Sequence, residues 1–381
     1  MSIVIFIIIL SALIIVHELG HFLAAKKFGI RVDEFGLGFP PRAKKLFIWK
    51  GTPFTLNWMP FGGFVKIFGE NPAEQEQLPA HGPASGNSRP TALALPANSF
   101  QSKNRGIQAT VLVAGVVGNF LFAWLLISLG FMTGLPAPAS MSLPLENART
   151  VITIVLPASP AASAGLKSGD AIISLSRGET DFLSADSDEA ISPAEASEFI
   201  AASLEPIVFE IERGEKIYTK VVIPEEGIIA DRPAAGISMD IIGIVKLSPY
   251  GAVWHGLKTT SELTLATGRA IGTFIFQAVG GRADLSSITG PIGILGMVGD
   301  VRELGFNYLL TFTALISINL AIINLLPFPA LDGGRLLFVG IEAVTRRSVP
   351  AKVFNVANTM GFALLIFLMI LITIQDVRNI F

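Results

Sequence analysis

The 381-residue chain contains no cysteine and few charged side chains. Without cysteine there are no disulfides, no thiolate nucleophile and no cysteine-ligated zinc, so nothing marks a redox compartment. Charged residues make up 15% of the chain and hydrophobic residues 51%, whereas a soluble domain averages about 25% charged residues. This balance predicts a polytopic membrane protein with one extramembrane domain. The formal net charge of -2 argues against nucleic-acid binding, which normally needs a basic face.

Histidine is also scarce, and two of the 4 histidines share one apolar run, Ile3 to Ala25. The run is long enough to cross a bilayer as a helix, and it contains His17-Glu18-Leu19-Gly20-His21. Residues i and i+4 lie on one helix face, so His17 and His21 can bind one metal ion, with Glu18 placed to take a proton from water. Ionisable groups are costly at this depth, which indicates function. The alternative is a structural cluster of hydrogen-bonded side chains.

The basic residues predict the orientation of the spans. Eight lysines and arginines follow the first run and two more precede the second: Lys26, Lys27, Arg31, Arg42, Lys44, Lys45, Lys50, Lys66, Lys103 and Arg105. By the positive-inside rule this segment is cytosolic, so the two histidines lie near the cytosolic end of their helix. Runs at Ile107 to Leu129, Tyr308 to Leu326 and 356–376 complete four spans with both termini outside. The first run is too long, and lacks the basic n-region, for a cleaved signal peptide.

The segment between the first two spans contains strand signals. Lys45 to Trp49 and Phe54 to Met59 are short strand-like runs around a turn, and Pro60 to Ile67 continues the pattern. A surface hairpin is the alternative, but these runs are more apolar than a solvated loop normally is. The pattern therefore favours a β-structure that packs against the membrane helices. The edge of that structure could pair with an extended substrate. Residues 71–98 have no periodicity and predict a flexible loop, in which His81 is expected to have no catalytic or metal-binding role.

The second span carries a buried amide, Asn119, next to two small residues. Gly115 and Gly118 are three residues apart, as close helix packing requires. The Asn119 side chain either makes a hydrogen bond in the packing between helices or is directed at the metal site, and the sequence leaves both possibilities open.

Residues 147–245 predict a small α+β domain. Strands are expected at Val151 to Val155, at Ala171 to Leu175 and in a hairpin of Ile207 to Glu212 with Tyr218 to Ile223, with a helix from Pro193 to Ser203. The following segment, Pro249 to Val279, predicts an amphipathic interfacial helix because charged residues lie along it. His255 is expected to be an interfacial side chain.

Two histidines leave a catalytic zinc site incomplete, because such sites usually have three protein ligands and one open position. Asp332 is the candidate third ligand. Pro327 and Pro329 cannot continue the third span as a helix, and Gly333 with Gly334 permits a tight backbone that turns Asp332 inward. The alternative is that Asp332 only caps the helix that follows.

These motifs together resemble the site-2 protease family, intramembrane zinc metalloproteases of the M50 type, and its bacterial RseP-like branch. The resemblance covers nearly the whole chain. It rests on His17-Glu18-Leu19-Gly20-His21, Glu34-Phe35-Gly36-Leu37-Gly38-Phe39, Pro60-Phe61-Gly62-Gly63-Phe64-Val65-Lys66, Ser159-Pro160-Ala161, Ala164-Gly165-Leu166-Lys167-Ser168-Gly169-Asp170 and Asn324-x-x-Pro327-x-Pro329-x-Leu331-Asp332-Gly333. The chain departs from the family in carrying one PDZ-like domain where many relatives have two, and in Gly115-Val116 where relatives usually have Gly-Pro.

The resemblance implies an enzyme that cleaves single-span membrane proteins within the membrane after a first protease has acted. It implies Zn²⁺ bound by His17, His21 and Asp332, with Glu18 as general base. Substrate-binding residues would be Asn324 and, in the membrane-reentrant β-loop, Gly62, Gly63 and Phe64. The implied partners are transmembrane substrates, such as pre-cleaved anti-sigma factors or signal-peptide remnants, the lipid bilayer and a ligand of the PDZ-like groove. The implied location is the bacterial inner membrane.

The expected fold is therefore a polytopic α-helical membrane protein with four transmembrane helices, a membrane-associated β-hairpin and one extracytosolic α+β PDZ-like domain. The expected division is 1–28 (first span), 29–104 (cytosolic segment), 105–135 (second span), 147–245 (PDZ-like domain), 246–304 (interfacial helices), 305–334 (third span), 335–355 (cytosolic loop) and 356–376 (fourth span). The alternative function is a non-catalytic PDZ scaffold with a vestigial metal site. A metal transporter is a weaker alternative, because only one polar cluster lies in the spans.

Overall fold

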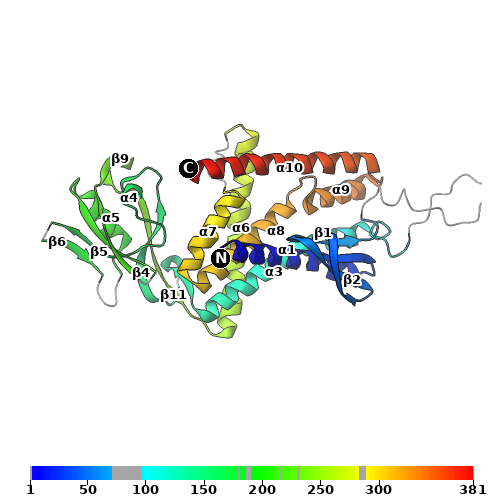
Figure 1. The fold of residues 1–381 in the computed structure, drawn as a ribbon, viewed down its shortest axis with the longest axis horizontal. Coiled ribbons are helices and arrows are strands. Elements are labelled where there is room, and N and C mark those ends of the chain that lie inside the picture. The colour runs from blue at the N-terminus through cyan, green and yellow to red at the C-terminus, as the bar shows by residue number, and fades with distance from the viewer. Residues whose placement is uncertain are drawn as a thin grey trace, which may run out of the picture. The chain divides into compact units, whose positions relative to one another are not determined.

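The computed structural model describes residues 2–70, 96–141, 143–178, 180–185, 190–214, 216–229, 232–282 and 289–380 (Figure 1). The predicted loop 71–98, with His81, lies outside the described residues except for 96–98. The chain forms two compact units, which we describe separately. The first comprises Met1–Leu126, Leu257–Gly299 and Phe312–Phe381, and the second comprises Ile127–Gly256 and Asp300–Thr311.

Four of the helices in the described ranges are long and apolar enough to cross a membrane, so the number of candidate spans equals the number predicted. They are α1 (Ser2–Lys27), α3 (Arg105–Thr133), α8 (Phe306–Leu325) and α10 (Ala351–Ile380). The other long helices are α6 (Pro249–Val279), α7 (Pro291–Leu304) and α9 (Asp332–Thr345). The helix predicted from Pro249 to Val279 is thus found with those bounds. The segment 335–355 was expected to be a loop, but α9 fills much of it because its apolar residues recur at helical spacing.

A twisted β-hairpin packs on α1 in the first unit. It consists of β1 (Val32–Trp49) and β2 (Thr52–Ile67), joined at Lys50 and Gly51, which both have positive φ (Figure 1). The predicted strands are present, but β1 begins much earlier than expected, at Val32. Phe35, Gly36 and Leu37, near the start of β1, pair with both halves of β2, so the hairpin folds over itself.

Aromatic side chains anchor this hairpin to the end of α1. Phe22 of α1 is fully buried, and its ring lies 5.7 Å from that of Phe35 and 5.4 Å from that of Phe54. Phe35 and Phe54 stack on each other at 4.7 Å. Burying each of these rings contributes about 1.5–3 kcal/mol. The hairpin is therefore fixed to the helix turn that follows His21.

Helices α1 and α3 cross in backbone contact. A Cβ added to Gly20 would lie 2.1 Å from the carbonyl oxygen of Ala114, and one added to Gly118 would lie 2.9 Å from that of Val16. No larger residue fits at these two positions. The small residues of the second span thus have the packing role that the sequence predicted.

The second unit is built around an antiparallel sheet of seven strands. Its order is β3-β11-β4-β5-β7-β8, with β6 paired to β5, and β9 pairs separately with β10. The strands are β3 (Leu135–Pro138), β4 (Glu146–Val155), β5 (Ala171–Arg177), β6 (Asp181–Ser184), β7 (Ile207–Arg213), β8 (Lys216–Val222), β9 (Glu225–Ile229), β10 (Arg232–Ala234) and β11 (Ile237–Val245). A short 3₁₀ helix, η1 (Ala139–Met141), follows β3.

Two capped helices and a buried ion pair complete this unit. Helix α4 (Pro160–Ser163) is capped by the Ser159 side chain, and α5 (Pro193–Ala201) has Pro at its first turn, as predicted, and a capping box. The fully buried Asp170 carboxylate accepts two hydrogen bonds from Arg213, at 2.5 and 2.7 Å. The core lies under the sheet and includes Leu175, Ile207, Phe209 and Ile211. The predicted α+β character of this region is confirmed.

Candidate active site

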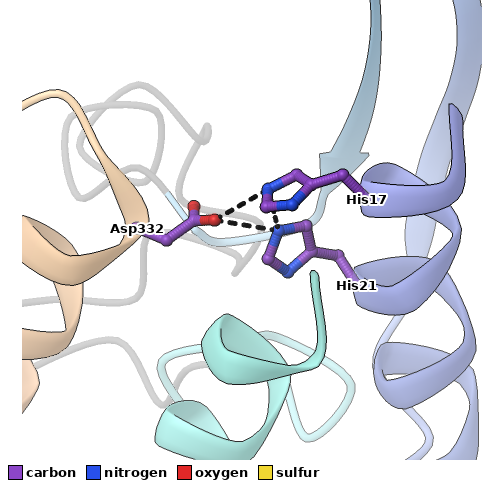
Figure 2. A group of neighbouring side chains, drawn as sticks. All are labelled: His17, His21 and Asp332. Carbon is purple, nitrogen blue, oxygen red and sulfur yellow. Dashed lines mark hydrogen bonds and ion pairs between the residues drawn. The ribbon is translucent and has the colours of Figure 1, made fainter. Parts of the chain in front are cut away.

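Two imidazoles of α1 and one carboxylate of α9 meet in the first unit (Figure 2). His17 and His21 lie one turn apart and are both buried, with 7% and 5% of their surfaces exposed. Asp332 Oδ2 lies 2.9 Å from His17 Nε2 and 3.1 Å from His21 Nε2, and the two Nε2 atoms are 3.2 Å apart. The three residues thus direct one ligand atom each at a common point, although 311 residues separate His21 from Asp332.

This arrangement fits a zinc ion. Imidazole nitrogen and carboxylate oxygen lie about 2.0–2.2 Å from tetrahedral zinc, which separates two ligand atoms by about 3.3–3.5 Å. The observed separations of 2.9, 3.1 and 3.2 Å are a few tenths of an ångström shorter, so a small outward movement would admit the ion. Among the residues that the structure describes, His17, His21 and Asp332 are the cluster of histidine and acidic side chains close enough together to hold a metal ion.

The break between α8 and α9 places Asp332. Helix α8 ends at Leu325, before Pro327 and Pro329, and Ala330 adopts a positive φ of 76°. Gly333 is tightly enclosed, because a Cβ there would lie 2.1 Å from the carbonyl oxygen of Leu326. Asp332 is the first residue of α9, whose N-cap is Leu331 without a side-chain hydrogen bond. The structure therefore excludes the alternative that Asp332 serves only as a helix cap.

The Asp332 carboxylate lies between the two imidazoles, with its Oδ2 atom within 3.1 Å of both Nε2 atoms. A carboxylate at this point supplies the negative charge that a divalent cation needs.

Gly115 of α3 provides the floor of the site. A Cβ at this position would lie 2.3 Å from His21 Nε2 and 2.8 Å from His17 Cε1. Any side chain would displace the two ligand rings. Sequence analysis assigned Gly115 only to helix packing, and its three-residue spacing from Gly118 could not show that it faces the imidazoles.

Glu18 lies beside the metal group and contacts the hairpin. Its Oε2 atom accepts a hydrogen bond from the backbone N–H of Val65 in β2, at 3.0 Å. The carboxylate also interacts electrostatically with His17, His21 and Asp332. The C-terminal half of β2 therefore runs directly past the site.

The predicted substrate-binding residues fall in two places. Gly62, Gly63 and Phe64 lie on β2, and a Cβ on Gly63 would be 3.7 Å from the side chain of Ile14, one turn before Glu18. Asn324 is half-buried near the end of α8, and its side chain makes no hydrogen bond to the residues that the structure describes. His255 lies on α6 and does not belong to the metal group.

Asn119 is aimed at the metal group, which resolves the question that the sequence left open. It is fully buried, and its side-chain nitrogen lies 3.3 Å from His17 Nδ1, the ring nitrogen opposite the one that faces Asp332. An amide in an apolar span was the sequence signal, but only the rotation of α3 about its axis shows which neighbour it meets.

Known proteins resemble this chain over its whole length. The model of a family described as peptidase family M50 matches residues 5–368. A putative zinc metalloprotease of Clostridium perfringens is 33% identical over 370 residues, which cover 96% of each chain. The zinc metalloprotease RasP of Geobacillus kaustophilus is 30% identical and is covered over 98% of its length. The regulator of sigma-W protease RasP of Bacillus subtilis is 28% identical over 456 residues and covered over 99%.

Proposed function

The chain belongs to peptidase family M50 and is a membrane-bound zinc metalloprotease of the site-2 type, and we propose on that premise that it cleaves the membrane-spanning segments of single-span proteins. The observation that carries the proposal is the meeting of His17, His21 and Asp332 at separations of 2.9 to 3.2 Å. In this proposal these three residues hold the zinc ion. Zinc bound there would supply a Lewis acid that polarises the scissile carbonyl and lowers the pKa of the attacking water.

Glu18 acts as the general base. Its carboxylate accepts one proton from the water molecule as the water oxygen forms its bond to the peptide carbonyl carbon. It then delivers that proton to the peptide nitrogen as the carbon–nitrogen bond breaks. The Val65 N–H bond holds one carboxylate oxygen, Oε2, at 3.0 Å, which orients the other oxygen for this exchange.

The hairpin presents the substrate as an extended strand. A transmembrane helix hides its carbonyls in hydrogen bonds, so the cleaved segment must unwind before hydrolysis. Pairing with an exposed strand edge would hold it open. The segment from Phe54 to Ile67, with Gly62, Gly63 and Phe64, is proposed for this role because β2 passes the Glu18 carboxylate. Asn324 is proposed to hold the same strand from α8, since its amide has no hydrogen-bond partner in the described part of the chain.

We propose that the site faces the cytosolic side of a bacterial inner membrane. The basic residues between the first two spans support this orientation, with 29–104 and 335–355 cytosolic. The domain at 147–245 would then be extracytosolic, and we propose that it is a PDZ-like domain that excludes intact substrates. We propose pre-cleaved anti-sigma factors as one substrate class; a relative is named regulator of sigma-W protease, which links that relative to a sigma factor.

A PDZ scaffold without catalysis is less well supported. Such a protein has no need for an aspartate that meets two buried imidazoles, or for a carboxylate at Glu18 directed by a backbone N–H. A metal transporter would need polar ligands repeated along several spans. In the described spans the histidine and acidic groups that could bind metal gather at this one point.

Cleavage in proteoliposomes tests the proposal. The purified protein is reconstituted with a single-span reporter that lacks most of its outer domain, and product is measured on gels. We expect cleavage within the span, its loss after zinc is removed with a chelator, and its return when zinc is added. A reporter whose span is stabilised with extra leucines is the control and should be cut more slowly. Equal cleavage of the chelated and the zinc-loaded protein would contradict the proposal.

A further inference from the structure

The two imidazoles of the metal group have different partners on Nδ1, the ring nitrogen that does not face Asp332 and that we call the outer nitrogen. His21 Nδ1 lies 2.8 Å from the backbone carbonyl oxygen of Val111. A carbonyl oxygen can only accept, so His21 Nδ1 carries the proton and donates it. In a neutral ring this leaves the lone pair on Nε2, the atom that faces Asp332. Backbone geometry of α3 thus sets His21 in the protonation pattern that a metal ligand needs.

His17 needs the same pattern, and its outer nitrogen faces a side chain instead. His17 Nε2 faces Asp332, so a lone pair is required there and a proton on Nδ1. The neighbour of Nδ1 is the Asn119 amide, with the amide nitrogen at 3.3 Å. An amide nitrogen can only donate, and in that orientation it would require the lone pair on Nδ1 and the proton on Nε2, where the metal binds.

Rotating the Asn119 amide by half a turn removes this conflict. The oxygen and nitrogen of an asparagine amide are nearly identical in shape, so their assignment follows from the hydrogen bonds. Asn119 is fully buried, and its Oδ1 atom has no partner among the described residues. The rotation brings this oxygen to His17 Nδ1 and places the amide nitrogen where the oxygen was. It breaks no other hydrogen bond of the side chain in the described part of the chain, since the His17 contact is its sole one there.

We propose that Asn119 is a positioning residue for the metal site, whose amide oxygen accepts the Nδ1 proton of His17 and so fixes the ring with Nε2 toward the metal. This inference rests on the proposed ligand set. The residue itself is held firmly, because the Ser317 hydroxyl of α8 donates to the Asn119 backbone carbonyl at 2.8 Å. The second span would thus orient both histidines of the first, through Val111 for His21 and through Asn119 for His17.

Zinc affinity of three variants, measured by competition with a chelator, tests the inference. Asn119→Leu removes the acceptor and should weaken zinc binding by about 10–100-fold, as losing an outer partner of a metal-bound histidine typically does. Asn119→Asp keeps an acceptor of the same size and should bind zinc as tightly as the unsubstituted chain. Gly106→Ala is the control. It changes the same helix at a position where the added Cβ would meet only the Asn104 side chain, at 3.4 Å, and it should leave the affinity unchanged.

Unchanged affinity in Asn119→Leu would overturn the inference, and so would equal weakening in the Leu and Asp variants, because the acceptor would then be irrelevant. If Asn119→Leu does not fold, nitrogen NMR of the zinc-free, ¹⁵N-histidine-labelled chain decides, because zinc bound at Nε2 would by itself place the proton on Nδ1. With 4 histidines in the sequence the signals can be assigned by substitution. A protonated Nδ1 on His17 is expected, and an unprotonated one would refute the role. Absence of zinc from the unsubstituted chain would instead refute the proposed function.

Discussion

Replacing Glu18 with glutamine is expected to abolish cleavage while leaving zinc bound. The amide has nearly the shape of the carboxylate but cannot take a proton from water, so the rate should fall by about 10²–10⁴-fold, the usual contribution of a positioned base. The zinc content should not change, because Glu18 lies beside the metal group and not in it. Single-turnover cleavage of the reporter and zinc analysis of the same preparation measure both quantities.

Glu18→Asp is the matched comparison for this variant. It keeps a base but shortens the side chain, which draws the carboxylate away from the Val65 N–H that holds it at 3.0 Å. We expect partial activity, between that of Glu18→Gln and that of the unsubstituted protein. Activity of Glu18→Gln equal to that of the unsubstituted protein would remove Glu18 from the mechanism.

A single methyl group at Gly115 is expected to destroy the metal site. The added Cβ of Gly115→Ala would lie 2.3 Å from His21 Nε2, far inside the contact distance, so the imidazoles must leave the positions in which they meet Asp332. Zinc affinity should fall by more than the roughly 10–100-fold caused by losing an outer-shell partner, because here the ligand atoms themselves are displaced. Cleavage should be lost with the metal. Chelator competition and reporter cleavage measure the two effects.

Gly106→Ala on the same helix is the control for this experiment. Its Cβ would meet only the Asn104 side chain, at an ordinary 3.4 Å. Alanine is the better helix former by roughly 1 kcal/mol at either position, so loss of zinc in one variant alone cannot come from helix stability. Normal zinc binding by Gly115→Ala would show that the two helices are not in contact at the site.

The metal group could be predicted from sequence because its parts are local. The four-residue spacing of His17 and His21 determines that they share a helix face. Pro327, Pro329 and the paired glycines indicate that the chain unwinds beside Asp332. Charge asymmetry then predicts that both lie at the same depth. None of these arguments requires knowing how one helix is oriented about its own axis relative to its neighbour.

The surroundings of the metal group could not be predicted, because they depend on such rotations. Gly115 and Asn119 lie one turn apart on α3, and both face α1 only because Gly20 allows the backbones to touch. The early start of β1 was also missed. Residues from Val32 onward include two glycines and lack alternation, and they become a strand through pairing with β2 and burial of Phe35 against Phe22. Tertiary contacts, which local propensity does not contain, determine these features.

The zinc content of the purified chain, with and without the Asp332→Ala substitution, tests the central claim most directly. The account predicts one zinc ion per chain in the unsubstituted protein and loss of that zinc in Asp332→Ala, because removing one of three ligands opens the site. Equal zinc in the two proteins would contradict it, since the aspartate of α9 would then not complete a site with the histidines of α1.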